Sequence, residues 1–490
     1  MMHSAMPNWL AKRAFLTPER VAIVDGKVSL TFREFHESVQ AIARKLARTG
    51  IGKGDFVGLL VENSYRAPQL IYALQYVEAV TVLLNIRLTA NELKWQLQDS
   101  GCRWLIYDAA LSTIAEGLKT EYTTLSLLSY SDIVAQEEAD VALATELSLE
   151  SLHTVIYTSG TTGYPKGVLL TNGNHWWSVM GSAINLGIQE QDRWLVCVPL
   201  FHVSGLSIML RTVIYGMTMV IHRKFLPHEV NQAICQDGIS LVSVVTSMVT
   251  AMLQELKEEG YPVSFRCLLL GGGPAPLSVL RDCRDKHIPV YQTYGMTETA
   301  SQLATLSPEY LDSKIGSAGK ALFPSELRIE ARGKVMEFGE VGEIVVRGPT
   351  VTQGYLHSKQ HDQETFSGGW LHTGDLGYMD RDGFLYVLDR RSDLIISGGE
   401  NVYPAEIEAV LCSHPAVVEA GVAGIPHERW GQVPVAFVVL SRCIDQEELK
   451  VFCSENLAGY KLPHEIYYVA SLPRSAANKL LRRKLLNLLP

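Results

Sequence analysis

The sequence lacks the features that point to a zinc site, a disulfide framework or a membrane span. Its eight cysteines are scattered, with no C-x-x-C pair and no histidine cluster beside them, so we expect neither bound zinc nor disulfides. The longest stretch without a charged residue or histidine, residues 238–254, is shorter than the ~20 apolar residues that cross a bilayer. The first ten residues do not resemble a signal peptide. A cytoplasmic protein is therefore expected.

A basic surface for nucleic acid is also lacking. The formal net charge is −9, and no run of lysine and arginine interleaves with aromatic residues, so we do not expect a nucleic-acid partner. The chain is rich in hydrophobic residues (47%) and modest in charge (19%), which is typical of a folded globular protein. At 490 residues it is about three times a typical domain, which indicates a large body with a smaller appended domain.

Alternating apolar runs and amphipathic stretches predict an α/β fold with a large N-terminal body of mainly parallel sheets flanked by helices. Capping boxes at Thr31 with Glu34 and at Thr89 with Glu92 predict two helix starts. Strands are expected at residues 21–24, 56–61, 80–84 and 104–107.

The pattern changes in the last third of the chain. Residues 314–387 read as a β-rich subdomain with a hairpin turn at Asp382-Gly383. After Asp389 it becomes α+β, with a helix at 404–411, strands near 417–422 and 435–440, and a helix capped by Asp445 with Glu448. We predict an N-terminal domain at 1–388, a hinge at 389–392 and a small C-terminal domain at 393–490.

The strongest local motif is the segment from Tyr157 to Gly167, YTSGTTGYPKG, which follows an apolar strand. Hydroxyls and exposed backbone amides can surround phosphate oxygens, glycines permit close approach, and Lys166 supplies a mobile positive charge. The spacing is not that of a Walker loop. The segment predicts a polyphosphate site; the alternative is a flexible surface turn.

Here the chain resembles the adenylate-forming enzymes, the family of acyl-CoA synthetases, luciferases and peptide-synthetase adenylation domains. Further segments follow in the family's order: 198–205 (VPLFHVSG), 271–276 (GGGPAP), 291–300 (YQTYGMTETA), 373–375 (TGD), 389–390 (DR) and 473–480 (PRSAANKL). The resemblance covers nearly the whole chain. It implies an enzyme that uses magnesium-bound ATP to convert a carboxylic acid to its acyl adenylate, with a C-terminal domain that moves.

The resemblance assigns roles to residues of these segments. ATP is expected to bind at Thr158, Ser159, Gly160, Thr161, Thr162, Lys166, Gly271, Gly272, Gly273, Pro274, Tyr294, Gly295, Thr299, Asp375, Arg390 and Lys479. Magnesium would be held at Glu298 and Thr158, since a hard cation prefers oxygen ligands. Catalysis is expected from Lys479, Lys166, Thr158 and His202.

Each role has a plainer alternative. Without the family, His202 could be a core histidine, Glu298 a helix-start carboxylate, Asp375 a turn residue and Lys479 a solvated lysine. Asn478 stands where many relatives have glycine, and asparagine tolerates the left-handed backbone.

Coenzyme A is expected at Gly398, Gly399 and Trp430, and the hinge at Ser392, where many relatives carry Asp or Lys. Glycines suit a thin pantetheine arm that passes close to the backbone. A turn that enters the helix at Pro404 is the alternative.

Within the family, the resemblance is to CoA ligases of an aromatic dicarboxylate, carried by residues 185–187, 191–194, 204–205, 215–217 and 389–403. One carboxylate reacts and the other needs a cation, a role that the resemblance gives to Arg211 beside His202 and Ser204. A surface-paired helix arginine is the alternative. Ligation of another aryl or fatty acid, or a catalytically silent adenylate-binding protein, remains open, as does a homo-oligomer.

Overall fold

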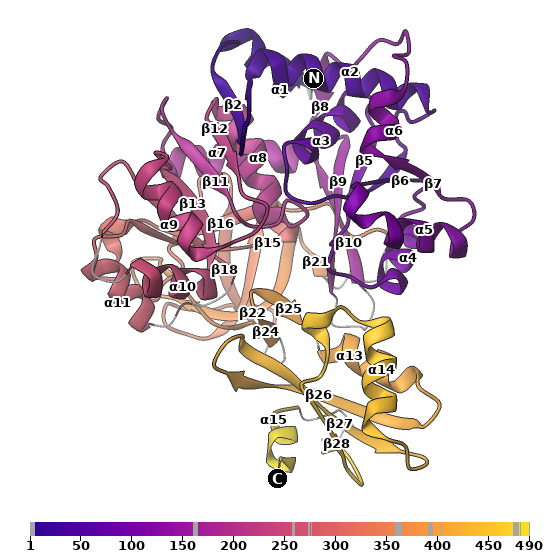
Figure 1. Ribbon diagram of the computed structural model, residues 1–490. Helices are drawn as coiled ribbons and strands as arrows, with labels where there is room; N and C mark the ends of the chain where they lie inside the picture. Colours follow the sequence, from indigo (N-terminus) through magenta and orange to yellow (C-terminus); the bar gives the residue numbers. More distant parts are fainter. Residues whose placement is uncertain are drawn as a thin grey trace. The chain divides into compact units, whose positions relative to one another are not determined.

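The computed structural model describes residues 5–159, 165–256, 260–272, 275, 277–357, 365–390, 395–402, 404–473, 480 and 482–489. The chain forms two compact units, which are drawn in Figure 1. The first comprises Met1–Ile86, Ser100–Ile156 and Val168–Leu388, and the second comprises Arg87–Asp99, Tyr157–Gly167 and Asp389–Pro490. The predicted domain boundaries and the hinge at 389–392 stay predictions, and Ser392 lies outside the described residues.

One sheet of six strands carries the N-terminal part of the chain. In spatial order its strands are β10 (Pro165–Thr171), β9 (Leu152–Ser159), β5 (Val80–Leu83), β4 (Phe56–Leu60), β6 (Trp104–Tyr107) and β7 (Ser126–Ser129). The pairs from β9 through β7 are parallel. The intervening helices are α3 (Arg66–Tyr76), α4 (Ala90–Asp99), α5 (Ser112–Glu121) and α6 (Tyr130–Ala135).

A nine-stranded sheet forms the centre of the first unit. Its order is β17 (Lys320–Ala321), β16 (Ser301–Leu306), β15 (Val290–Met296), β14 (Cys267–Gly271), β13 (Leu241–Val245), β11 (Arg193–Val196), β12 (Thr218–Ile221), β2 (Val21–Asp25) and β3 (Val28–Thr31). The strands from β15 to β2 are parallel, and antiparallel pairs close both edges. The predicted α/β class is confirmed.

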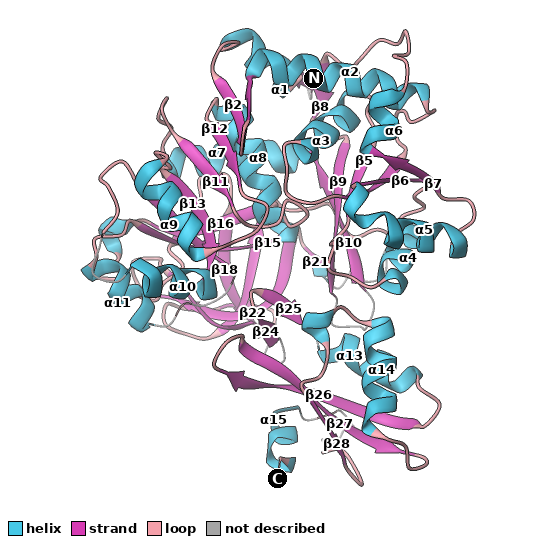
Figure 2. Ribbon diagram, viewed as in Figure 1, coloured by secondary structure: helices cyan, strands magenta, loops and turns pink. Residues whose placement is uncertain are grey.

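Helices cover both faces of this sheet because successive strand residues point to opposite sides. Along β11, Trp194 and Val196 join one core with α8 (Val203–Tyr215), whereas Leu195 joins the other. That second core contains the buried faces of α9 (Pro227–Gln236) and α10 (Thr246–Leu256), together with residues of α11 (Leu277–Asp285). Figure 2 shows these helices in cyan around the magenta strands.

The helix caps read from the sequence are present. The Thr31 hydroxyl accepts from the Glu34 amide at the start of α2 (Phe32–Arg48), and the Glu34 carboxylate accepts from the Thr31 amide. Thr89 and Glu92 make the same reciprocal pair before α4. Each pair satisfies amides that the first helical turn leaves without a helical partner. The four predicted N-terminal strands also form, within one residue at their ends.

The β-rich subdomain forms a third sheet. Its order is β19 (Lys334–Val335), β18 (Glu326–Ala331), β20 (Gly342–Arg347), β22 (Trp370–Met379) and β21 (Phe366–Ser367), with β23 (Leu385–Arg390) also paired to β22. The predicted hairpin turn joins β22 to β23. Gly383 there has φ +81°, a conformation that favours glycine, and the Tyr378 and Tyr386 rings stack at 4.9 Å across the hairpin.

Four more elements belong to the first unit. Strands β1 (Ala5–Pro7) and β8 (Glu146–Ser148) pair with each other, helix α1 (Trp9–Leu16) follows β1, and helix α7 (Asn172–Leu186) follows β10.

The second unit contains a largely antiparallel sheet, as the α+β pattern predicts. Its order is β25 (Glu400–Val402), β24 (Ile395–Ser397), β27 (Gly431–Leu440) and β26 (Val417–His427), with β28 (Glu465–Tyr468) also on β27; the helices are α13 (Pro404–Ser413), α14 (Gln446–Asn456) and α15 (Arg482–Leu485). Asp445 caps α14 as expected, but it accepts from the Glu447 amide and shows no capping box with Glu448.

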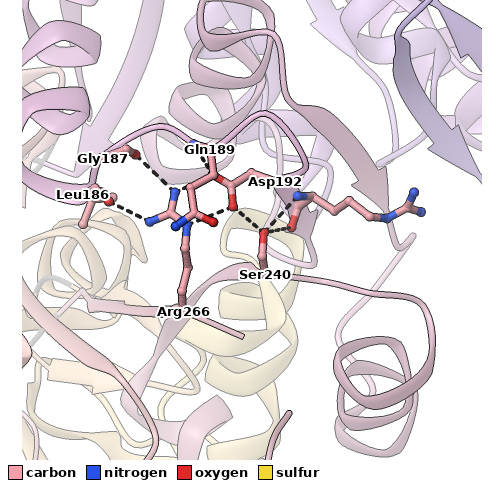
Figure 3. Close-up of polar contacts among 7 residues, drawn as sticks. Leu186, Gly187, Gln189, Asp192, Ser240 and Arg266 are labelled. Atoms are coloured by element: carbon pink, nitrogen blue, oxygen red, sulfur yellow. Dashed lines mark hydrogen bonds and ion pairs between the residues drawn. The ribbon is translucent and has the colours of Figure 1, made fainter. Parts of the chain in front are cut away.

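A buried polar cluster fixes the amino ends of three parallel strands (Figure 3). Asp192, 2% exposed, precedes β11 and accepts from Ser240, which precedes β13, at 2.8 Å and from Arg266, which precedes β14, at 2.9 Å. Arg266 also donates to the carbonyls of Leu186 and Gly187 at the end of α7. The cluster therefore stabilises the edge of the sheet at the amino ends of its strands. Ligands of α/β proteins bind at the other edge, at the carboxyl ends.

Two further findings concern the chain as a whole. All eight cysteines are free thiols. Among the described residues, no helix has both the length and the apolar character needed to span a bilayer.

Candidate active site

Helix α8 presents a polar stripe within an otherwise apolar and buried helix. Ser204, Ser207 and Arg211 are spaced at i, i+3 and i+7, which places them on one face. The face of a helix that is turned away from solvent is normally apolar. Here, however, this face carries Ser207, which is 5% exposed, and Arg211, which is 1% exposed. A polar stripe buried in this way needs partners, and a bound substrate can supply them.

Arg211 is the most unusual member of the stripe. Its Nε and Nη2 atoms have no hydrogen-bond partner among the described residues, and its guanidinium lies 5.6 Å from the Trp194 ring centre. Burial lowers the pKa of Arg211, partly offset by Tyr215 and Cys267. The alternative of a surface-paired arginine is therefore contradicted. The site has an unpaired buried cation suited to an anionic group.

Ser207 is a site residue that the sequence reading missed. Its hydroxyl donates to the Ser204 carbonyl at 2.8 Å, and the Ser301 hydroxyl lies 3.3 Å away at the start of β16. The signal was present, because Ser207 completes the helical spacing that Ser204 and Arg211 begin.

His202 lies at the carboxyl end of β11, where the chain turns into α8. It is the N-cap residue of that helix, with extended backbone, and its half-buried ring lies 4.7 Å from the ring of Phe201. The turn is tight: the His202 amide donates to the Pro199 carbonyl at 3.2 Å. From this end α8 runs back across the sheet, so Arg211 lies roughly 13 Å further along the helix axis at 1.5 Å per residue.

A strained turn follows β15 and carries Glu298 and Thr299. Ala300 and Ser301 have φ +51° and +96°, which is rare for residues with side chains. Gly295 is required because a Cβ there would meet the Ser301 carbonyl oxygen at 1.9 Å. Strain of this kind persists only where surrounding contacts hold it, and it is common at functional sites.

Glu298 and Thr299, which were predicted to contact magnesium and the nucleotide, differ in their surroundings. Glu298 is 7% exposed and accepts from the Tyr355 hydroxyl at 3.0 Å. Thr299 is fully buried, and its hydroxyl is bonded to the backbone of Met296 and Ser301. In this structure Thr299 stabilises the turn, and its contact with a phosphate stays a prediction.

The structure brings together the predicted adenine and ribose residues. Tyr294, on β15, donates its hydroxyl to Asp375 of β22 at 2.7 Å, and both are buried. Gly271 ends the parallel strand β14, and Gly272 follows it. A Cβ on Gly272 would approach Val245 at 2.9 Å, and Gly272 has φ +82°. Packing against the neighbouring strand and the backbone conformation thus account for a glycine at position 272. Its role in adenine binding stays a prediction.

Several predicted residues belong to the second unit. Thr158 is the next-to-last residue of strand β9 and Lys166 is the second residue of β10, on either side of the predicted phosphate loop. Gly398 and Gly399 form the turn between β24 and β25, both with positive φ. A Cβ on Gly398 would meet the Trp430 indole at 2.8 Å, and the Gly398 amide donates to the Trp430 carbonyl. Gly398 and Gly399 therefore lie in the turn of one β-hairpin, not in the turn that enters the helix, and Gly398 packs against Trp430 in the turn between β26 and β27.

The remaining predicted residues cannot be placed. Gly160, Thr161, Thr162, Gly273, Pro274, Ser392 and Lys479 lie outside the described residues. Of Ser159 and Arg390 only the backbone is described, in β9 and β23.

Comparison with known proteins identifies the family. The model for AMP-binding enzymes matches residues 10–356, and the model for their C-terminal domain matches residues 406–479. Two 2-succinylbenzoate–CoA ligases, from Geobacillus sp. (strain WCH70) and Geobacillus kaustophilus (strain HTA426), are each 55% identical, covering 100% and 99% of this chain and 99% of their own lengths.

Comparison with solved structures identifies the same family. A double mutant of o-succinylbenzoate CoA synthetase from Bacillus subtilis, bound with a product analogue, gives a TM-score of 0.94 at 45% identity, with 99% of this chain and 98% of that chain covered. The same enzyme in complex with ATP and magnesium ion gives 0.77 at 45% identity, covering 98% and 99%. The chain belongs to the family of AMP-binding, adenylate-forming enzymes.

Proposed function

We propose that the chain is an ATP-dependent ligase that converts 2-succinylbenzoate and coenzyme A to 2-succinylbenzoyl-CoA, with AMP and pyrophosphate as the other products. Full-length relatives at 55% identity carry the name of this activity. The structural observation that supports the acid is Arg211, a buried guanidinium with two nitrogens that have no partner among the described residues. A monocarboxylic acid would leave that cation unpaired, whereas a dicarboxylate supplies a second anion for it.

The reaction has two steps. In the first, a carboxylate oxygen of the acid attacks the α-phosphorus of ATP, and pyrophosphate leaves. In the second, the thiol of coenzyme A attacks the carbonyl carbon of the mixed anhydride, loses its proton, and AMP leaves. No protein nucleophile is needed, so the residues act by positioning and by charge.

The residues divide these tasks. Tyr294 and Asp375 are proposed to bind adenine and ribose, and their mutual hydrogen bond holds each in place. Lys166 and Lys479 are proposed to neutralise charge on the phosphates. Arg211 orients the acid from the far end of its pocket, beyond His202.

The residues also fit a magnesium ion. Glu298 offers a carboxylate that is nearly buried and oriented by Tyr355, and oxygen is the ligand that magnesium prefers. Among the described residues there is no cluster of three acids, histidines or cysteines that could hold a metal, so phosphate oxygens of the nucleotide would complete the coordination. When bound, the ion supplies positive charge that offsets the charge on the phosphates.

Coenzyme A is proposed to approach the second unit at the turn of Gly398 and Gly399. The turn has no side chains of its own, and Trp430, 43% exposed, gives it an aromatic wall. We also propose a cytoplasmic location, since eight free thiols suit a reducing compartment. The homo-oligomer stays a prediction, which light scattering after size-exclusion chromatography would test.

The test is a mass-spectrometric assay of the purified protein with ATP, magnesium and coenzyme A over a panel of acids. We expect 2-succinylbenzoyl-CoA and AMP with 2-succinylbenzoate, and little thioester with benzoate, 4-phenylbutyrate or fatty acids. Preference for a monocarboxylic acid would reject the proposed substrate. Absence of AMP with every acid would reject the enzymatic function.

A further inference from the structure

One buried amide side chain connects the acid-pocket turn to the carboxyl ends of three strands. Asn63 follows strand β4 of the six-stranded sheet and is 6% exposed. Its Nδ2 donates to the carbonyls of Val198 at 2.9 Å and His222 at 3.3 Å, and its Oδ1 accepts from the Leu200 amide at 2.9 Å. Val198 and Leu200 follow β11, and His222 follows β12, so this side chain connects the six-stranded sheet to the nine-stranded sheet.

The orientation of the amide is fixed by its partners. The Leu200 amide can only donate, so the atom facing it must be the oxygen, and the nitrogen then faces the two carbonyls. All three polar positions are thereby matched. No aliphatic side chain can reproduce this pattern, and a carboxylate can reproduce only the acceptor.

The segment that carries Asn63 is itself held in place from two directions. The Glu62 amide donates to Asp108, which follows β6, at 2.8 Å, and the Tyr65 amide donates to Asp25, at the end of β2, at 2.9 Å. The backbone is therefore fixed on both sides of Asn63. The three hydrogen bonds of its side chain hold the residues that they contact at a defined place relative to this backbone.

The contacted residues form the turn that presents His202. Asn63 bonds both neighbours of Pro199, whose carbonyl accepts from the His202 amide at 3.2 Å. Gly205, in the first turn of α8, packs so closely on this turn that a Cβ would lie 2.2 Å from the Pro199 oxygen. A shift of Pro199 would thus displace both His202 and the start of the helix that carries Ser204.

We infer that Asn63 is a positioning residue for the acid pocket, which acts through the Val198–Leu200 turn to place His202 and the start of α8. The inference rests on the proposed function, in which His202 lies beside the reacting carboxylate. A displacement near 1 Å can cost about 100-fold in rate, so loss of three hydrogen bonds at this turn should be visible in kinetics.

The test compares two buried asparagines of the first unit. Asn63→Ala should raise the KM for the acid by about 10- to 100-fold and lower kcat, with the KM for ATP changed by less than about twofold. Asn63→Asp, which keeps the acceptor for Leu200 but turns a carboxylate oxygen toward two carbonyl oxygens, should lose at least as much as the alanine variant. Asn231→Ala is the control: that side chain, on α9, is 8% exposed and is bonded to Met252 of α10 and to Tyr261 in the loop before β14, in the second core.

The outcomes are distinguishable. If both alanine variants lose stability to a similar degree and neither changes the KM for the acid, Asn63 is a structural residue and the inference is wrong. A double-mutant cycle gives the second criterion: the loss on Asn63→Ala should largely disappear in a His202→Ala background, because one residue acts through the other. Additive losses would overturn the inference. If the wild type forms no thioester with 2-succinylbenzoate, the proposed function fails instead.

Discussion

Replacing Arg211 by leucine should improve stability and impair the use of the acid at the same time. In the protein without substrate, the guanidinium is 1% exposed and two of its nitrogens have no partner among the described residues. It carries a charge from which burial has removed water, as the lowered pKa of Arg211 reflects. The side chain therefore costs folding free energy that only a bound anion offsets.

The two effects have different sizes. Replacement of a buried charged group by a well-packed apolar one is commonly neutral or stabilising by about 1–4 kcal/mol, so the melting temperature of Arg211→Leu should rise or stay unchanged. Loss of a buried charge pair with the substrate costs about 2–5 kcal/mol, which corresponds to a rise of about 30-fold or more in the KM for 2-succinylbenzoate. The KM for ATP should hardly change, since Tyr294 and Asp375 are untouched.

Steady-state kinetics with varied acid and varied ATP, together with thermal unfolding, measure both effects. Arg13→Leu is the matched control, because Arg13 donates to the carbonyls of Val213 and Ile214 in the last turn of the same helix. That variant should be less stable and keep its KM for the acid. If Arg211→Leu is destabilised and its KM for the acid is unchanged, Arg211 is an ordinary core residue and the assignment of the second carboxylate is refuted.

Three more outcomes are expected. Asp192→Ala should lower the free energy of unfolding by about 3–5 kcal/mol, because it removes the buried carboxylate and leaves the partly buried charge of Arg266 without its counter-ion; urea unfolding measures this, and a change below about 1 kcal/mol would contradict it. Burial lowers the pKa of His153 from 6.5 to about 4, so protons bind the unfolded chain first as pH falls. The contribution of His153 to the free energy of unfolding is therefore complete above pH 6.5, and about 2 kcal/mol of that free energy should be lost between pH 7 and pH 5. His153→Leu should reduce this dependence of stability on pH. Lys479→Ala should slow adenylation by about 100-fold or more and spare thioester formation from supplied acyl adenylate; equal losses in both steps would defeat its assignment.

Local rules were sufficient to predict much of the fold. Capping boxes, apolar runs and the Asp382-Gly383 turn depend on neighbours in sequence, and each formed where the sequence indicated. The order of strands in the sheets could not be read in this way. Strand β11 lies between β12 and β13, and β2 joins β12, because long-range packing decides which edges meet. The cap of α14 was predicted less accurately, because Asp445 accepts from the amide of Glu447 and not from that of Glu448, one residue later.

The site shows the same division between local and distant information. Arg211 was proposed from a resemblance, and only the structure revealed that it is buried and that two of its nitrogens lack a partner in the part of the chain that the structure describes. Asn63 was not singled out, because a lone asparagine after an apolar strand carries no periodic signal. Its importance depends on carbonyls at residues 198 and 222, which are separated from it by 135 and 159 positions. Contacts at such distances are visible only once the sheets are assembled.

Similarity of sequence and participation in the site are also different properties. The segments 185–187 and 191–194 supported the resemblance to ligases of an aromatic dicarboxylate, yet Leu186, Gly187 and Asp192 belong to the cluster at the amino ends of the strands. Ligands of α/β proteins bind at the opposite ends. Exchange of Asp192 should therefore lower stability without changing the choice of acid, whereas exchange of Arg211 should impair the use of the acid without lowering stability. A position that supported the resemblance and a position whose role the resemblance assigned thus have separable physical roles.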